Sequence, residues 1–161
     1  MKSFFHAKKL ALGAIIAALY AALTLVSASF GLALGPIQVR ISEALVILPV
    51  FTPSAIPGLF LGCLLANLIS GAHAVDVIFG SVATLLGALG TYALRKKPLL
   101  ALLPPIVANG VILPPIIYYV FGFPAGLPLL FVIFWVEEAL SAGLLGWVLY
   151  RVLRKKKNLF L

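Results

Sequence analysis

Two adjacent glutamates interrupt a long apolar stretch near the C-terminal end of the sequence. The segment VIFWVEEALSAG, residues 132–143, contains Glu137 and Glu138, and the surrounding run 127–150 holds no other acidic or basic side chain. A carboxylate at the centre of a membrane helix costs roughly 2.5–3.5 kcal/mol on insertion scales, so two adjacent carboxylates need compensation. A purely structural role is the alternative, but no basic residue is expected at their depth to neutralise them. The pair therefore predicts a functional site within the membrane.

The other polar residues inside apolar segments are candidate members of the same site. Arg40 and Glu43 are three residues apart, and a simple ion pair at a helix start is the alternative for them. Asp76 begins another apolar segment, where favourable interaction with the helix dipole is the alternative. Asn67 and Asn109 lie inside apolar segments, where hydrogen bonds between helices would explain them equally well.

The composition defines the class of protein that must position these residues. Of 161 residues, 63% are hydrophobic and 10% are charged, and the mean hydropathy is +1.20. Soluble domains are nearer 45–50% apolar and about 25% charged. A soluble core of this length could not hide so much apolar surface, so the sequence predicts an all-α integral membrane protein.

The net charge of +8 is carried by short basic clusters at the ends of apolar runs. This distribution is the positive-inside signal of membrane proteins rather than a nucleic-acid-binding stripe. The single cysteine, Cys63, excludes an intrachain disulfide, and no residue spacing predicts a metal site. The clusters are Lys2, Lys8 and Lys9; Arg95, Lys96 and Lys97; and Arg151 with 154–157.

The hydrophobic pattern divides the chain into six membrane helices in one domain, 1–161. The second is only about 11 residues long, short of the roughly 20 that cross a bilayer, and short segments of this kind often mark a binding site. The first is too long for a signal peptide and is expected to be retained. Pro104-Pro105 and Pro114-Pro115 are expected to break the fifth. The predicted helices span about 10–33, 41–51, 54–70, 75–94, 99–121 and 127–151.

Six crossings place both termini and the loop at Arg95–Lys97 on one side, which the positive-inside rule makes cytoplasmic. Gln38, Arg40 and Glu43 then lie at the outer mouth, while Asn109 and Glu138 lie near the midplane. The sequence thus predicts a polar funnel that opens outward and contains all four acidic residues.

Small residues recur every fourth position along the first helix. One stripe is formed by Gly13, Ala17 and Ala21, and an adjacent one by Ala14, Ala18 and Ala22. Such stripes let another helix approach closely. Packing inside the bundle and docking onto another membrane subunit are both consistent with the pattern.

Long stretches of the chain resemble a known family. GPIQVRISEALVILPVFTPSAIPGLFLGCLLANLISG and VDVIFGSVATLL resemble the QueT-like queuosine-precursor transporters, which are substrate-binding S components of energy-coupling factor (ECF) transporters. The resemblance runs over nearly the whole chain. It implies a six-helix bundle of the S-component type, multi-pass in the cell membrane, that captures a queuosine precursor of the 7-deazaguanine class from outside.

The resemblance also implies partners and site residues. A transmembrane coupling subunit and two cytoplasmic ATPase subunits would drive release, so ATP would be bound by the partners and no cofactor by this chain. The stripe of Ala14, Ala18 and Ala22, or that of Ala17 and Ala21, would contact the coupling subunit. The family pattern departs at Ile116, where many members carry a glutamate that Glu137 would replace. The residues implied to bind substrate are Arg40, Glu43, Asn67, Asp76, Asn109, Glu138 and, by that replacement, Glu137.

Two other classes of protein were weighed against this function. An intramembrane enzyme is disfavoured because the fourth residue after Glu138 is Ala142 rather than a basic residue, His6 and His73 are far apart, and no Gly-rich phosphate loop is present. A stand-alone secondary transporter or channel for a small polar or cationic metabolite, with the carboxylates as a proton site, is the alternative.

Overall fold

The computed structural model describes residues 2–32, 38–124 and 126–156, and these ranges are helical with no strand. Four helices are long and apolar enough to cross a membrane, at Ala7–Ser29, Ala74–Ala93, Leu100–Phe121 and Leu127–Lys156. This agrees with the predicted membrane class. The elements are α1 (Lys2–Ser29), η1 (Ile41–Val50), α2 (Ala55–Ile69), α3 (Ala74–Ala93), η2 (Leu100–Leu102), α4 (Leu103–Phe121), α5 (Leu127–Glu138), η3 (Ala139–Leu145) and α6 (Gly146–Leu153).

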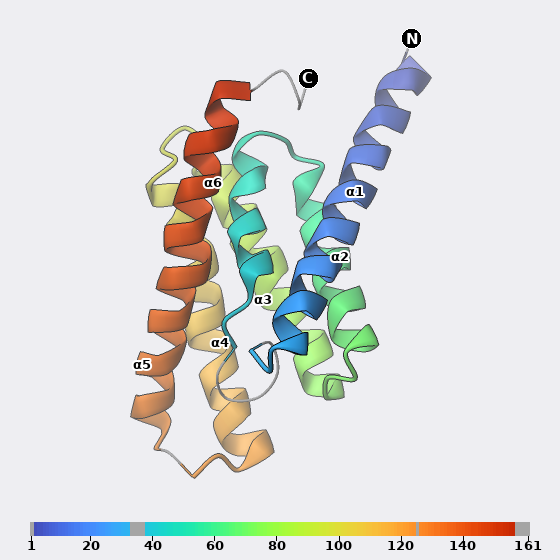
Figure 1. Ribbon diagram of the computed structural model, residues 1–161. Helices are drawn as coiled ribbons and strands as arrows, with labels where there is room; N and C mark the ends of the chain where they lie inside the picture. The colour runs from blue at the N-terminus through green and yellow to red at the C-terminus, as the bar shows by residue number, and fades with distance from the viewer. Residues whose placement is uncertain (1, 33–37, 125, 157–161) are drawn as a thin grey trace.

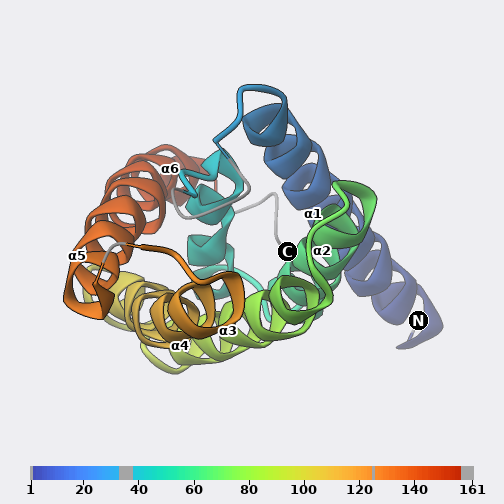
Figure 2. The same cartoon turned by 90° about the horizontal axis from the view of Figure 1, so that it is seen from below.

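The helices surround η1 in chain order. Seen along the bundle, α1, α2, α3, α4 and the continuous last helix of α5, η3 and α6 form a curved wall, and η1 lies within it (Figure 2). The start of α1, the end of α6 and the loop between α3 and α4 lie at one end of the bundle (Figure 1). The turn between α4 and α5 lies at the other end (Figure 1).

The first helix differs from its predicted limits of 10–33. It begins at Lys2, because the lysine-bearing turns continue the helix beyond its apolar part. It ends at Ser29, because Gly31 adopts a left-handed conformation with φ of 74°. The backbone N–H of Gly31 bonds to Ala28 O at 2.9 Å and that of Leu32 to Ser27 O at 2.9 Å, the pattern of a Schellman cap. The helix therefore stops before Gly35-Pro36, where the sequence had placed its end.

The short second segment, η1, is a 3₁₀ helix of 10 residues with Pro49 near its end. At about 2.0 Å per residue, this winding extends it over roughly 20 Å, against about 15 Å for an α-helix of the same length. All of its residues from Leu45 to Pro49 are buried, as is expected for a helix enclosed by others.

The two proline pairs of the fifth predicted helix act differently from each other. Pro104 and Pro105 occupy the first turn of α4, where their missing N–H groups cost nothing. Pro114 and Pro115 lie within α4, which continues through them to Phe121. The expectation that this second pair breaks the helix is therefore wrong. Neighbouring helices can compensate the backbone groups that a membrane proline frees.

The α1–α2 contact depends on glycines of α2. A Cβ atom added at Gly58 would lie 2.6 Å from Gly13 O, and one added at Gly62 would lie 2.7 Å from the Cβ of Tyr20 and 2.9 Å from Ala17 O. Ala17 and Ala21 are correspondingly buried, while Ala14, Ala18 and Ala22 are exposed. The stripe of Gly13, Ala17 and Ala21 thus packs inside the bundle, and this burial removes Ala17 and Ala21 from the docking surface expected from the sequence.

We predict that Gly62→Leu destabilises the protein by about 1–3 kcal/mol, because the new side chain overlaps Tyr20 and the backbone of α1. Heating the detergent-solubilised protein and measuring the remaining monodisperse fraction would detect the loss. Ala18→Leu adds a similar side chain to the exposed face of α1 and serves as the matched control. Equal thermal stability of the two variants would contradict the packing described here.

Candidate functional site

A small polar cavity lies inside the bundle where η1, α3, α4 and α5 meet. Its lining consists of Gln38, Arg40, Glu43, Gly80, Thr84, Asn109, Leu113, Phe134 and Glu138. The cavity volume is about 10 Å³, which is room for one water molecule. A larger occupant therefore requires these side chains to move apart.

Glu138 contacts α4 directly. Its Oε1 accepts a hydrogen bond of 2.9 Å from Nδ2 of Asn109, and its Oε2 is buried with no hydrogen-bond partner in the part of the chain that the structure describes. Glu138 is 6% exposed and Asn109 is 3% exposed. The predicted position of Asn109 opposite Glu138 is thus matched by the geometry, although contact of either residue with a ligand stays a prediction.

Glu137 turns toward the segment that precedes η1. Its Oε1 accepts a hydrogen bond of 3.1 Å from the backbone N–H of Gln38, and its Oε2 has no hydrogen-bond partner within residues 2–32, 38–124 and 126–156. Glu137 is as buried as Glu138 but is not part of the cavity lining. The two neighbouring carboxylates therefore have different partners, as expected from the roughly 100° between successive residues of a helix.

The first turn of η1 is held by side chains of α1. The Tyr20 hydroxyl donates to Oε1 of Glu43, and Thr24 Oγ1 donates to Ser42 Oγ at 2.7 Å. The backbone N–H of Ile41 donates to Ser27 Oγ at 3.1 Å. These three α1 residues are spaced by four and three positions, so they lie on one face of the helix.

Tyr20 was missed by sequence reasoning. It is fully buried, and its hydroxyl reaches the site through the hydrogen bond to Glu43. The signal that could have identified it is the buried polar stripe of Tyr20, Thr24 and Ser27, which runs beside the small-residue stripes. Thr84 and Phe134 of the cavity lining were also missed, because their residue types are ordinary in membrane helices.

Arg40 lies deeper than predicted. The sequence placed it at the outer mouth, with no basic residue near the depth of the glutamates; instead it is 6% exposed and lines the same cavity as Glu138. Its Nη2 donates to Oε1 of Gln38 at 2.8 Å. The reason is that η1 begins inside the bundle rather than at its surface (Figure 1), so the residues just before it are carried inward.

Asn67 and Asp76 lie beside the cavity and do not line it. Nδ2 of Asn67 donates to the backbone carbonyl of Asp76 at 3.2 Å, which joins α2 to α3. Oδ1 of each side chain is buried without a hydrogen-bond partner in the described part of the chain. Asn67 thus has the interhelical hydrogen bond that was its alternative role, and the role of both residues in binding stays a prediction.

The buried carboxylates of the site have oxygens that can still accept hydrogen bonds. Glu43, Glu137 and Glu138 each have one oxygen in a hydrogen bond to the protein and a second, buried oxygen that has no hydrogen-bond partner among the described residues. A buried acceptor without a partner costs about 1–3 kcal/mol, and more when it is charged. The cluster can therefore gain stability from a ligand that presents several N–H donors or a positive charge.

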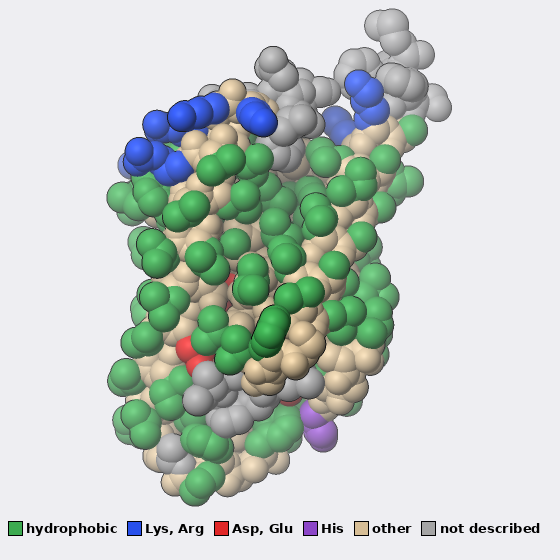
Figure 3. Space-filling view, viewed as in Figure 1, with side chains coloured by type: hydrophobic (Ala, Val, Ile, Leu, Met, Phe, Trp, Pro, Cys, Tyr) green, Lys and Arg blue, Asp and Glu red, His purple; other side chains and the backbone are tan. Residues whose placement is uncertain are grey.

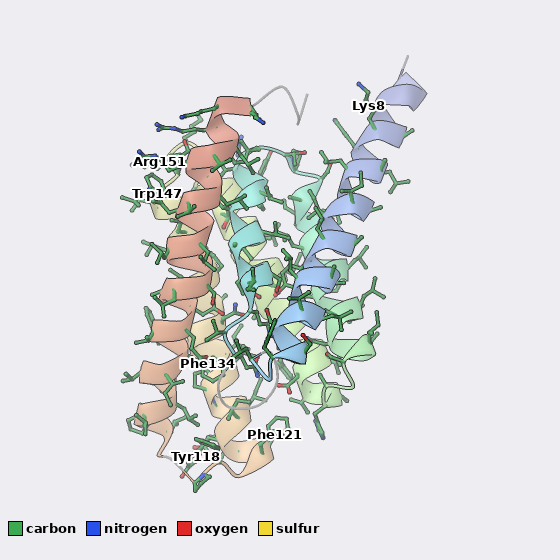
Figure 4. All side chains as sticks on the ribbon, viewed as in Figure 1. Lys8, Tyr118, Phe121, Phe134, Trp147 and Arg151 are labelled. Atoms are coloured by element: carbon green, nitrogen blue, oxygen red, sulfur yellow. The ribbon has the colours of Figure 1, made fainter. Side chains whose placement is uncertain are left out.

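Phe134 supplies the aromatic part of the lining. It is 1% exposed and packs with Leu113, Ile117 and Leu130 between α4 and α5. Figure 4 places it on α5, in the half of the bundle away from Arg151 and Lys8. An aromatic face beside carboxylates suits a flat, donor-rich ring better than a simple ion.

Comparison with known proteins identifies the family of the chain. The family model described as "QueT transporter" matches residues 10–155. The "Queuosine precursor transporter QueT" of Lactococcus lactis subsp. cremoris (strain MG1363) is 40% identical over 72 residues, which are 45% of this chain and 42% of that protein. The matched part thus spans less than half of that relative, and no solved structure matches the chain. The family match confirms the resemblance seen in the sequence, and the chain belongs to the QueT transporter family.

Proposed function

We propose that this chain binds a queuosine precursor of the 7-deazaguanine class, as the membrane-embedded substrate-binding subunit of an ECF-type importer. The observation that carries the proposal is the set of three buried carboxylates that each retain an unpartnered oxygen. The printed name of the Lactococcus relative supports the substrate class. Membership of a transporter family supports a role in transport rather than catalysis.

The chemistry of the ligand matches the cavity. The N1–H and exocyclic amine of a 7-deazaguanine are two parallel donors, which suit a carboxylate such as that of Glu138. A 7-aminomethyl group is cationic and suits a second carboxylate, for which Glu43 is placed on the same lining. The amide of Asn109 offers both a donor and an acceptor to the ring edge. The Phe134 ring can stack on the flat base.

Binding must be accompanied by movement of the walls. A bicyclic base is many times larger than the water-sized cavity of about 10 Å³. Binding of such a base in this cavity would therefore require the lining side chains to move apart. We expect association to be slower than diffusion allows, since complexes that require a conformational change associate more slowly than rigid ones.

We expect Glu138→Gln to weaken binding of 7-aminomethyl-7-deazaguanine by roughly 10- to 150-fold, the equivalent of about 1.5–3 kcal/mol for a hydrogen bond to a charged group. The glutamine can keep the bond from Asn109 through its carbonyl, but it puts an amide where the free carboxylate oxygen was. Calorimetric titration of the purified protein is the measurement. Glu137→Gln is the matched control and should cost clearly less, because Glu137 does not line the cavity. Unchanged affinity in Glu138→Gln would refute this assignment, and a loss confined to Glu137→Gln would reverse the two roles.

For the membrane topology we propose six crossings with both termini in the cytoplasm. The four long helices account for four crossings. The short helices η1, which begins inside the bundle (Figure 1), and α2 are proposed to belong to the other two. The basic loop after α3 lies at the same end as both termini (Figure 1), which the positive-inside rule assigns to the cytoplasm.

Cysteine labelling tests this orientation in intact cells. In a Cys63→Ser background, Pro124→Cys should react with a membrane-impermeant maleimide, and Lys96→Cys should react only after the membrane is permeabilised. Both positions are exposed, so a difference in labelling would report the side of the membrane and not burial within the protein. External labelling of Lys96→Cys with protection of Pro124→Cys would invert the topology and the outward opening of the site.

The exposed stripe of Ala14, Ala18 and Ala22 is the proposed docking surface for the coupling subunit. We expect Ala18→Leu or Ala22→Leu to abolish uptake driven by the coupling subunit and its two ATPases, because a larger side chain blocks close helix approach. Ligand affinity of the isolated subunit should be unchanged, which calorimetry measures. Uptake by this chain reconstituted alone would instead support a stand-alone secondary transporter.

A further inference from the structure

An apolar groove lies on the outer surface of the bundle and shares no lining residue with the polar cavity. It runs between the η2–α4 junction and the last helix and has a volume of about 490 Å³. Its walls include Leu99, Leu103, Ile106, Gly143, Leu144 and Trp147. Leu99, Leu103 and Leu144 are each at least half exposed, so the groove is open toward the surroundings of the bundle along its length.

The basic end of the bundle adjoins this groove. The loop that leads into Leu99 carries Arg95, Lys96 and Lys97, and the last helix continues one turn beyond Trp147 to Arg151. Arg151 and Trp147 lie together on α6 (Figure 4), with the guanidinium 6.0 Å from the ring centroid. The described basic residues of the loop after α3 and of the last helix, all exposed, are Arg95, Lys96, Lys97, Arg151, Arg154, Lys155 and Lys156.

Among the residues that the structure describes, no acidic side chain lies beside these basic ones. The sequence has four acidic residues, Glu43, Asp76, Glu137 and Glu138, and each of them lies within or beside the polar site. Figure 3 shows the basic side chains gathered at one end and the acidic ones in the other half of the molecule. An apolar groove with basic side chains at one end is complementary to a molecule with an anionic headgroup and a hydrocarbon tail.

We propose that this groove is a binding site for an anionic phospholipid of the cytoplasmic leaflet, with one acyl chain along Leu103 and Leu144 and the phosphate beside Arg151. Basic residues at the ends of membrane helices attract anionic headgroups, and tryptophan is enriched at the depth where headgroup and chain meet. An apolar transmembrane helix of a partner would fill the groove but would give the basic side chains no anionic group to bind. The anionic lipid satisfies both parts of the surface.

The site is separate from the surfaces used in the proposed transport function. The exposed alanine stripe is on α1, which lies on the other side of η1 from the last helix (Figure 2). Lipid binding here would therefore continue while a partner occupies α1, and it does not depend on the identity of the transported substrate.

Tryptophan fluorescence gives a direct test, because the chain has only Trp135 and Trp147. In a Trp135→Phe background, Trp147 is the single reporter. The full chain is reconstituted into phosphatidylcholine vesicles that contain a small fraction of a brominated lipid. This lipid is either phosphatidylglycerol or phosphatidylcholine, and in both the bromine atoms lie near the headgroup end of the acyl chains. We expect the brominated phosphatidylglycerol to quench Trp147 several-fold more effectively than the same fraction of brominated phosphatidylcholine.

Matched charge variants separate a built site from general surface attraction. Arg151→Gln should reduce the preference for the anionic lipid by a factor of roughly five, the contribution of one basic side chain near an anionic headgroup. Lys8→Gln removes one charge from α1, far from the groove (Figure 4), and should leave the preference unchanged. Equal quenching by the two lipids, or equal effects of the two variants, would overturn the proposal. Relief of quenching by millimolar inorganic phosphate would also overturn it, since it would identify a phosphate site that needs no acyl chain.

Discussion

The free-energy cost of burying carboxylates in an apolar bundle determines how the centre of this protein is built. Glu43, Glu137 and Glu138 need hydrogen-bond donors, and an α-helix in a membrane has none to spare because its backbone N–H groups are already used. The donors come from a tyrosine hydroxyl, an asparagine amide and the backbone N–H of Gln38. That last group is available because Gln38 precedes η1 and is not part of a helix. An irregular entry to η1, inside the bundle, is therefore what allows the acidic cluster to exist.

The 3₁₀ winding of η1 follows from this placement. A helix that starts among the others and still reaches the basic end must cover more length per residue than an α-helix does, and its ten residues span roughly 20 Å. Its first turn is held by Tyr20, Thr24 and Ser27 of α1, and the surrounding helices cover the rest. The same segment thus supplies Arg40 and Glu43 to the cavity and fills the centre of the fold.

Helix α1 joins the site to the outside of the bundle. One face, with Gly13 and Ala17, packs against the glycines of α2, and Tyr20 next to it reaches Glu43. The adjacent face, with Ala14, Ala18 and Ala22, is exposed. Because the helix is a rigid element, a displacement caused by a partner on the exposed face would act on the Tyr20–Glu43 hydrogen bond. In the proposed function, substrate binding and docking would be coupled through this one helix.

The sequence alone determined the class of the protein, its membrane-crossing helices and the residue types of its site. Composition and hydropathy set the solvent as a bilayer, and glutamates at membrane depth marked a functional site because buried charge is too costly to be incidental. These inferences are local, so they do not depend on how the helices are arranged. The end of α1 at Gly31 was local too, but it was missed because Gly35-Pro36 is the stronger turn signal.

Only the tertiary structure decided which polar residues meet. Arg40 lines the same cavity as Glu138, Tyr20 bonds to Glu43, and Asn67 and Asp76 lie beside the cavity rather than in its lining. The Asn67–Asp76 and Tyr20–Glu43 hydrogen bonds join residues 9 and 23 positions apart. The contacts of Arg40 and Glu43 depend on how deeply η1 enters the bundle. Likewise, two small-residue stripes with the same spacing were separated into a packed face and an exposed face by the position of α2. Periodicity shows that a helix has such a face, but the neighbour against which the face packs is a property of the assembled bundle.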